Sequence, residues 1–196
     1  LVRLDIRPAV FTKEMAQALS DEAQRQGKIA PVHIALDTGM SRIGYEPTEE
    51  SADEVQEIAA LPGIAIEGLF THFSRADEAD KTFTKGQFEK YMAFVDMLEN
   101  RGIHIPMRHC SNSAGIVDMP ELNLDAVRAG ITLYGLYPSE EVNKAQVPLR
   151  PVMELKSHIA YIKTLPAGRL ISYGGTYETK KELRVATIPV GYGDGY

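Results

Sequence analysis

The chain has 196 residues, of which 44% are hydrophobic and 24% are charged, and its formal net charge is −6. This is an ordinary globular composition for one or two domains, and the spread of acidic residues argues against a nucleic-acid-binding surface. No apolar run approaches the ~18 residues of a membrane-spanning helix, so we expect neither nucleic acid nor membrane as a partner. The single cysteine, Cys110, excludes an internal disulfide and favours a reducing compartment such as the cytoplasm.

Strands and helices alternate over the first two-thirds of the chain. Apolar side chains at helical spacing predict helices over residues 12–27, 48–61 and 84–102. Short apolar runs predict strands at residues 1–6, 31–36, 64–70, 105–109 and 124–128. This order is typical of right-handed βαβ units in a parallel sheet, and in this rhythm it favours an α/β fold of the TIM-type (β/α)8 barrel class. A complete barrel needs about 200 residues, so we expect only part of one.

The pattern changes after about Tyr137. Residues 152–165 alternate only partly between apolar and polar side chains, turn signals follow, and residues 184–193 predict another strand, which together favour antiparallel β structure. We therefore expect residues 1–138 to form a partial barrel and residues 139–196 to begin an antiparallel β domain. The chain begins without methionine and both its ends fall at predicted strands, so we expect a piece of a longer protein.

Polar residues follow three of the predicted strands. Residues 31–36 run into DTGMSRIG, residues 64–70 into THFSRADE and residues 105–109 into CSNSAG. The carboxyl ends of barrel strands form the active face, so we expect these clusters to lie near one another. Each cluster also has a plainer interpretation: Asp37 as a turn cap, His72 as a structural histidine and Cys110 as a packed small residue.

An anion site is suggested further along the chain. Ser113 lies near a helix start, and the backbone around Gly130 and Ile131 offers further N–H donors to a phosphate. Arg128 at a strand end is costly to bury alone, so we expect it to meet an acceptor in a cleft, with His109 as a candidate partner. The histidines lack metal-ligand spacing, and we predict no metal site.

Six strings occur together and in order: DTGMSRIG, EGLFTHFSRADE, HCSNSAG, VRAGITLYGL, ISYGGTY and PVGYGDGY. Over essentially all 196 residues the chain resembles alanine racemase, a family of isomerases that use pyridoxal 5′-phosphate (PLP). The resemblance implies a PLP-binding barrel followed by a β-rich domain. It also implies interconversion of L-alanine and D-alanine by two-base α-proton exchange, supplying D-alanine for peptidoglycan in the cytoplasm. The family works as a homodimer in which each active site is shared between subunits.

The same resemblance implies roles for individual residues. Tyr173 matches the tyrosine that takes the α-proton of L-alanine, opposite the lysine that carries PLP; a phenol needs nearby cations to act as a base near neutral pH. Arg128 matches the arginine at the pyridine nitrogen, and Arg42 and Tyr192 match substrate-binding positions. The remaining matches surround the cofactor: His72 beside its ring, Ser113, Gly130 and Ile131 at its phosphate, and His109 and Asn112 as supporting residues.

The chain departs from the family pattern at two important points. The PLP lysine of the family lies upstream of Leu1, so we expect this chain by itself to be inactive. Ala35 stands where many members have a lysine, often carbamylated, that holds the arginine matched by Arg42. Two other interpretations stay open: a serine/alanine racemase domain of a resistance protein, and a non-catalytic PLP-binding barrel, which lacks the β domain and its tyrosine. A partial barrel also leaves sheet edges open, so we expect the isolated chain to associate.

Overall fold

The computed structural model describes residues 1–195. The chain divides into two compact units, Leu1–Val152 and Met153–Tyr196. Each unit is built around its own strands, parallel in the first and antiparallel in the second. The two units are therefore described separately.

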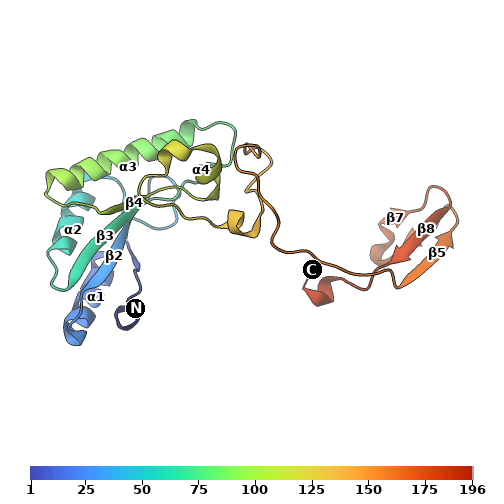
Figure 1. Ribbon diagram of the computed structural model, residues 1–196, viewed down its shortest axis with the longest axis horizontal. Helices are drawn as coiled ribbons and strands as arrows, with labels where there is room; N and C mark the ends of the chain where they lie inside the picture. The colour runs from blue at the N-terminus through green and yellow to red at the C-terminus, as the bar shows by residue number, and fades with distance from the viewer. Residues whose placement is uncertain (196) are drawn as a thin grey trace. The chain divides into compact units, whose positions relative to one another are not determined.

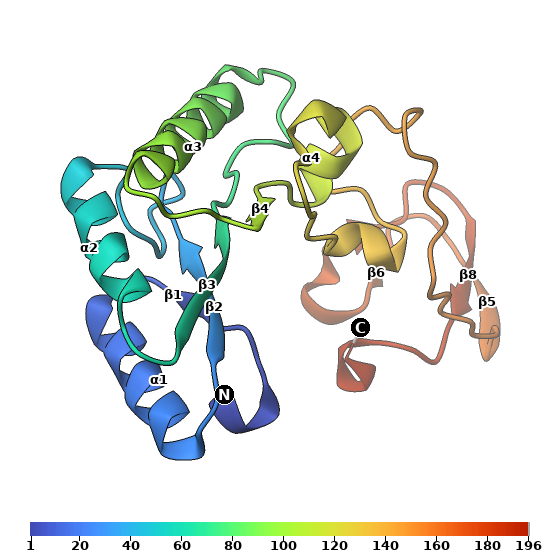
Figure 2. The same cartoon turned by 60° about the vertical axis from the view of Figure 1, so that its left-hand side comes forward.

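The first unit is a parallel sheet with helices on one face (Figures 1 and 2). Its four strands lie in chain order and are β1 (Ala9–Val10), β2 (Ala30–Ala35), β3 (Ile64–Phe70) and β4 (Met107–His109). The helices that cover the sheet are α1 (Lys13–Gln26), α2 (Glu49–Ala59) and α3 (Thr82–Asn100), and the short α4 (Ser113–Asp118) follows β4. Successive parallel strands joined by helices are the repeating unit of a (β/α)8 barrel. The predicted fold class, part of such a barrel followed by β-rich structure, is confirmed.

The three long helices form close to their predicted limits, and local signals define the ends of α1 and the start of α2. The hydroxyl groups of Thr12 and Thr48 accept backbone N–H bonds at the starts of α1 and α2, satisfying donors that a helix leaves free. Gly27 ends α1 with φ 62°, a conformation that glycine adopts without steric cost. Caps of this kind contribute about 1 kcal/mol each.

One core lies between the sheet and the three helices. Its members are almost fully buried, and each contributes about 1.5–3 kcal/mol by leaving water. From the strands and helices they include Val32, Ile34, Leu69, Val55, Ile58, Tyr91, Phe94 and Leu98. The helices therefore hold the sheet in place by their apolar faces, which leaves the carboxyl ends of the strands free to carry polar side chains.

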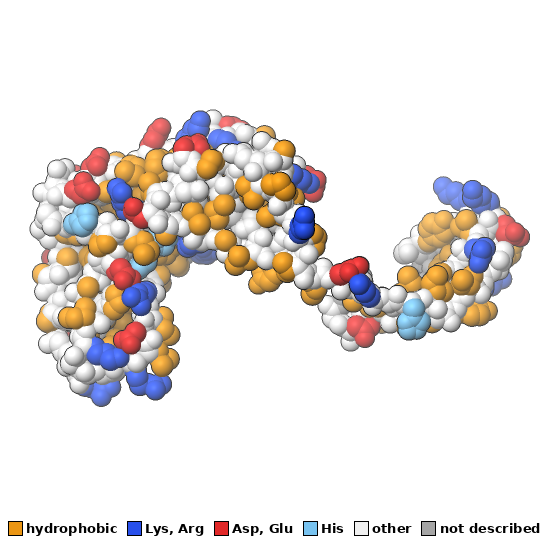
Figure 3. Space-filling model, viewed as in Figure 1, with side chains coloured by type: hydrophobic (Ala, Val, Ile, Leu, Met, Phe, Trp, Pro, Cys, Tyr) orange, Lys and Arg blue, Asp and Glu red, His pale blue; other side chains and the backbone are white. Residues whose placement is uncertain are grey.

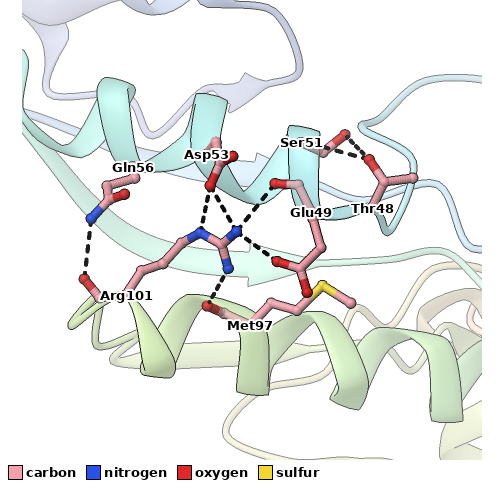
Figure 4. A network of polar contacts seen from close by, with 7 residues as sticks. All are labelled: Thr48, Glu49, Ser51, Asp53, Gln56, Met97 and Arg101. Carbon is pink, nitrogen blue, oxygen red and sulfur yellow. Dashed lines mark hydrogen bonds and ion pairs between the residues drawn. The ribbon is translucent and has the colours of Figure 1, made fainter.

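Arg101, just after α3, joins that helix to α2 (Figure 4). Its guanidinium group lies 2.6 Å from a Glu49 carboxylate oxygen and 2.7 Å from one of Asp53, and it donates to the Met97 carbonyl at 3.0 Å. Both carboxylates are exposed to solvent, and exposed ion pairs contribute only about 0–1 kcal/mol. The contact links the ends of the two helices and adds little to the stability of the fold.

The strand predicted at residues 1–6 is wrong. Val2–Leu4 form a 3-10 helix that ends at Asp5 in the left-handed conformation, with φ 51°. The buried side chain of Val2 packs with Ala23 and Ala30, and this packing outweighs the β propensity of the segment. The first strand of the sheet is instead Ala9–Val10.

The strand predicted at residues 124–128 is also not formed. Two backbone bonds run towards the segment around β4, from Asp125 N to Arg108 O at 3.1 Å and from Arg128 N to Ser111 O at 3.0 Å. Within residues 1–195 no further strand lies alongside, so the segment has no second ladder to regularise it. It nevertheless delivers Arg128 next to the end of β4.

The second unit consists of two antiparallel pairs. β5 (Tyr161–Leu165) pairs with β8 (Leu183–Thr187), and β6 (Leu170–Ile171) pairs with β7 (Tyr177–Glu178). The strand predicted over residues 152–165 forms only in its last part. Many apolar side chains of this unit are exposed: Met153, Leu155, Ile159, Tyr161, Ile162, Leu170, Tyr177 and Ile188. Large exposed apolar patches are found at protein–protein interfaces and ligand-binding grooves more often than on the free surface of a monomer.

Charged side chains of both signs are intermixed on the face of the first unit seen in Figure 3. No helix within residues 1–195 is long and apolar enough to cross a bilayer.

Candidate active site

A cavity of about 340 Å³ lies beyond the ends of β3 and β4, within the size range of small-molecule sites. Six residues singled out in the sequence line it: His72, Asn112, Ser113, Arg128, Gly130 and Ile131. Asp77, Ala114 and Pro138 complete its lining and were not predicted as site residues. The structure therefore brings together residues from the loops after β3 and β4 and from the segment that begins at Arg128, at the carboxyl edge of the sheet where the barrel pattern predicts the site.

Arg128 is the most extensively bound side chain of the cavity. Its Nη1 donates to His109 Nδ1 at 2.6 Å and to the His109 carbonyl at 3.0 Å. Its Nη2 donates to the carbonyls of Thr71 at 2.7 Å and Cys110 at 3.2 Å, and the cation lies 5.2 Å from the centre of the Phe70 ring. Within residues 1–195 no acceptor is recorded for its Nε–H, so one donor is left over at the cavity wall.

The two histidines around Arg128 are neutral at neutral pH. Burial, together with the cation of Arg128, lowers the pKa of His109 to about 4 and also lowers the pKa of His72. Because a guanidinium group only donates, Nδ1 of His109 must be an unprotonated acceptor. The proton of the neutral ring then sits on Nε2.

In a ¹⁵N NMR titration of the complete protein, we expect His109 to take up a proton only as the pH falls towards about 4. Its folded pKa lies below its ordinary value of 6.5, so the unfolded chain binds the proton first. Stability should therefore fall as the pH is lowered from about 6.5 to about 4. A His109 midpoint near pH ~6.5 would contradict the buried, neutral ring.

Ser113 organises the other side of the cavity. Its Oγ accepts the backbone N–H of Gly130 at 3.0 Å and of Thr132 at 3.4 Å, and lies 3.2 Å from Thr132 Oγ1. Within residues 1–195 the N–H of Ile131 has no recorded acceptor. Asn112 has a structural part, since its Oδ1 caps α4 at the N–H of Gly115 and its Nδ2 donates to the chain after β3.

Gln87 of α3 was not predicted as a site residue, although it bonds both the loop after β2 and the loop after β3. It is only 2% exposed, and its Nε2 donates to Thr38 Oγ1 at 3.2 Å and to the His72 carbonyl at 3.1 Å. Its Oε1 accepts from Ser74 N at 3.0 Å. The helical spacing could have indicated that Gln87 is buried, because it stands four residues before Tyr91 on the apolar face of α3.

The Asp37 cluster takes the plainer interpretation. One carboxylate oxygen of Asp37 accepts three successive backbone N–H groups, those of Gly39, Met40 and Ser41, which is a turn cap. A larger cavity of about 430 Å³ lies beside it, but shares no lining residue with the Arg128 cavity. We therefore place the candidate site at Arg128.

Arg42 is exposed and has no recorded hydrogen bond or ion pair with residues 1–195. It is near enough to His72 for its charge to help lower the pKa of that histidine. Ala35 is buried at the end of β2 and its methyl group offers no polar contact, so the side chain at this position does not hold the arginine.

Tyr173 and Tyr192 belong to the second unit. Tyr173 begins the turn between β6 and β7 and its side chain is 89% exposed. Ser172 before it has φ 61° and ψ −168°, a backbone region that costs about 1–3 kcal/mol outside glycine and clusters at functional sites. Tyr192 is similarly exposed. Neither tyrosine hydroxyl makes a hydrogen bond within residues 1–195, and their roles stay predictions.

Comparisons with known sequences cover the whole chain. The family description "Alanine racemase, N-terminal domain" matches residues 1–138, and "Alanine racemase, C-terminal domain" matches residues 152–196. An alanine racemase of Clostridium perfringens is 52% identical over 196 residues, which are 100% of this chain and 51% of that protein. One of Methanococcus maripaludis is 46% identical over 100% of this chain and 52% of that protein. The chain therefore spans about half the length of the curated relatives it matches.

Solved structures give the same result. An alanine racemase of Clostridium difficile 630 matches with a TM-score of 0.88 and 45% identity, over 100% of this chain and 51% of that one. The alanine racemase of Bacillus anthracis with bound L-Ala-P matches with a TM-score of 0.79 and 33% identity, over 99% of this chain and 50% of that one.

Proposed function

The chain belongs to the alanine racemase family, and from this premise we propose that the complete protein interconverts L-alanine and D-alanine with PLP as its cofactor. The observation that carries the proposal is the cavity in which Arg128 keeps one unpaired N–H donor while Ser113, Gly130 and Ile131 stand together nearby. A donor on Arg128 suits a neutral ring nitrogen, and the donors around Ser113 and Ile131 suit a phosphate.

The residues present fit PLP. Arg128 would donate to the pyridine nitrogen, which stays unprotonated because a guanidinium group does not give up its proton. The hydroxyl of Ser113 and the N–H of Ile131 would hold the phosphate, with Gly130 fixing this turn beside Ser113 through its own N–H bond to Oγ, and His72 would lie beside the ring. When bound, PLP withdraws electrons from the α-carbon of the amino acid and so makes its α-proton acidic.

The other assignments complete the proposal. Tyr173 takes the α-proton of L-alanine at its phenol oxygen, while a lysine outside residues 1–196 serves the opposite face of the substrate. Arg42 and Tyr192 bind the substrate. The exposed apolar side chains of the second unit support a homodimer with a shared active site. We further propose that residues 1–138 belong to the barrel and residues 139–196 to the β domain, and that the enzyme supplies D-alanine for peptidoglycan in the cytoplasm.

The test follows the α-proton itself. In deuterated water, with PLP, the complete protein should incorporate deuterium at the α-carbon of L-alanine and form D-alanine, with L-serine run in parallel to measure substrate preference. Borohydride treatment followed by peptide mapping should place reduced PLP on a lysine upstream of Leu1. A protein that binds PLP but leaves the α-proton of alanine in place would refute the proposal. Faster exchange on serine than on alanine would show that serine is the preferred substrate.

A further inference from the structure

We propose that Glu67 and His33 are positioning residues for Arg128: they hold His109 in the tautomer that accepts from the arginine, and thereby aim the remaining Arg128 donor at the ring nitrogen of the cofactor. The inference rests on the proposed function and deepens it. Neither Glu67 nor His33 was singled out in the sequence.

The four groups form one continuous line of hydrogen bonds. Arg128 Nη1 lies 2.6 Å from His109 Nδ1, and His109 Nε2 lies 2.8 Å from His33 Nδ1. His33 Nε2 lies 3.3 Å from Glu67 Oε2. The His33 side chain is 15% exposed and His109 is buried, so water does not compete freely for the inner bonds.

The direction of this line is fixed from both ends. A guanidinium group only donates, so His109 Nδ1 accepts and its Nε2 carries the proton. That proton needs an acceptor, so His33 Nδ1 accepts and His33 Nε2 carries the proton. A carboxylate only accepts, so Glu67 accepts the hydrogen bond from His33 Nε2–H. Both rings are thus held neutral in a single tautomer each.

Glu67 is kept as a carboxylate by Arg7. Arg7 Nε donates to Glu67 Oε2 at 2.8 Å and Arg7 Nη2 to Glu67 Oε1 at 3.3 Å. This two-point contact lowers the pKa of Glu67, so the acceptor end of the line persists near neutral pH.

The backbone is shaped to allow this arrangement. In the β2–β3 ladder Val32 pairs with Ile66 but His33 pairs with Gly68, so Glu67 is an extra residue in a β-bulge. Bulges re-aim side chains next to active sites. A Cβ atom on Gly68 would lie 2.6 Å from His33 Nδ1, so the glycine leaves the space that the imidazole ring occupies. The Phe70 ring, stacked on His109 at 5.2 Å, supports the second ring.

Loss of the line would leave His109 free to place its proton on Nδ1. Two N–H donors, one from His109 and one from Arg128, would then face each other at hydrogen-bond distance. The guanidinium group would have to turn away, and its unpaired donor would leave the position at which it meets the cofactor.

The experiment compares His33→Leu with His33→Asn in the complete protein. The amide oxygen of asparagine can accept from His109 Nε2 in place of His33 Nδ1, whereas leucine cannot. Glu67→Leu is the second variant, because leucine accepts no hydrogen bond from His33 Nε2, and Glu89→Leu, exposed on α3, is its matched control. The readouts are the ¹⁵N NMR tautomer of His109 in PLP-free protein, the absorbance of bound PLP, and kcat and KM for alanine.

In the unaltered protein and in His33→Asn we expect one His109 tautomer, protonated at Nε2. His33→Leu and Glu67→Leu should show mixed tautomers, a shifted absorbance band and a kcat lowered by about tenfold or more with little change in KM. Identical His109 tautomers in His33→Leu, Glu67→Leu and the unaltered protein would overturn the inference. The NMR readout needs neither cofactor nor turnover, so failure of the proposed function is seen separately, as absent exchange in the unaltered protein.

Discussion

Tyr173→Phe is expected to lower α-proton exchange on L-alanine by about 10²–10⁴-fold in the complete protein, because the phenylalanine keeps the ring and loses only the group that moves the proton. The fold should not change. The side chain is 89% exposed and its hydroxyl makes no hydrogen bond within residues 1–195, and such substitutions usually alter stability by less than about 0.5 kcal/mol. Deuterium incorporation followed by NMR measures the rate, and thermal unfolding measures the stability.

Tyr177→Phe is the matched control for this experiment. Tyr177 lies in β7 of the same hairpin, and its side chain is also exposed. Its variant should exchange the α-proton at the unaltered rate. Undiminished exchange in Tyr173→Phe, or equal loss in both variants, would remove Tyr173 from the role of base.

Arg128→Met should destabilise the complete protein by at least about 3 kcal/mol and weaken PLP binding. Methionine fills similar space but donates no hydrogen bond. The carbonyls of Thr71, His109 and Cys110 and the Nδ1 of His109 would lose their donors, and each buried group left unpaired costs about 1–3 kcal/mol. Chemical denaturation and titration with PLP measure the two effects.

Arg25→Met provides the comparison for a surface arginine. Arg25 pairs with Glu22 three residues earlier on α1, and its side chain is 70% exposed. Exposed pairs contribute about 0–1 kcal/mol, so this variant should unfold close to the unaltered protein. If Arg128→Met proved no less stable than Arg25→Met, the buried hydrogen bonds of Arg128 would not be structural.

The helices and the sheet are largely predictable because their signals are local. Thr12 and Gly27, for example, cap the two ends of α1, and both signals lie in the sequence of the helix itself. The strand predicted over residues 1–6 failed for a non-local reason, since burial of Val2 beneath α1 decided its conformation. In the second unit the strand predicted over residues 152–165 also depended on a distant partner, because only Tyr161–Leu165 pairs with β8.

The sequence by itself determined the three long helices, the strands β2, β3 and β4, the family, and six of the residues that line the Arg128 cavity. Periodicity, helix caps and short motifs are read within a few residues of one another. Only the tertiary structure decided what those residues are bonded to. His33 meets His109 across 76 positions of the chain, and Gln87 reaches Thr38 across 49. Contacts at such separation depend on strand register, a β-bulge and the space left by Gly68, which no local pattern specifies.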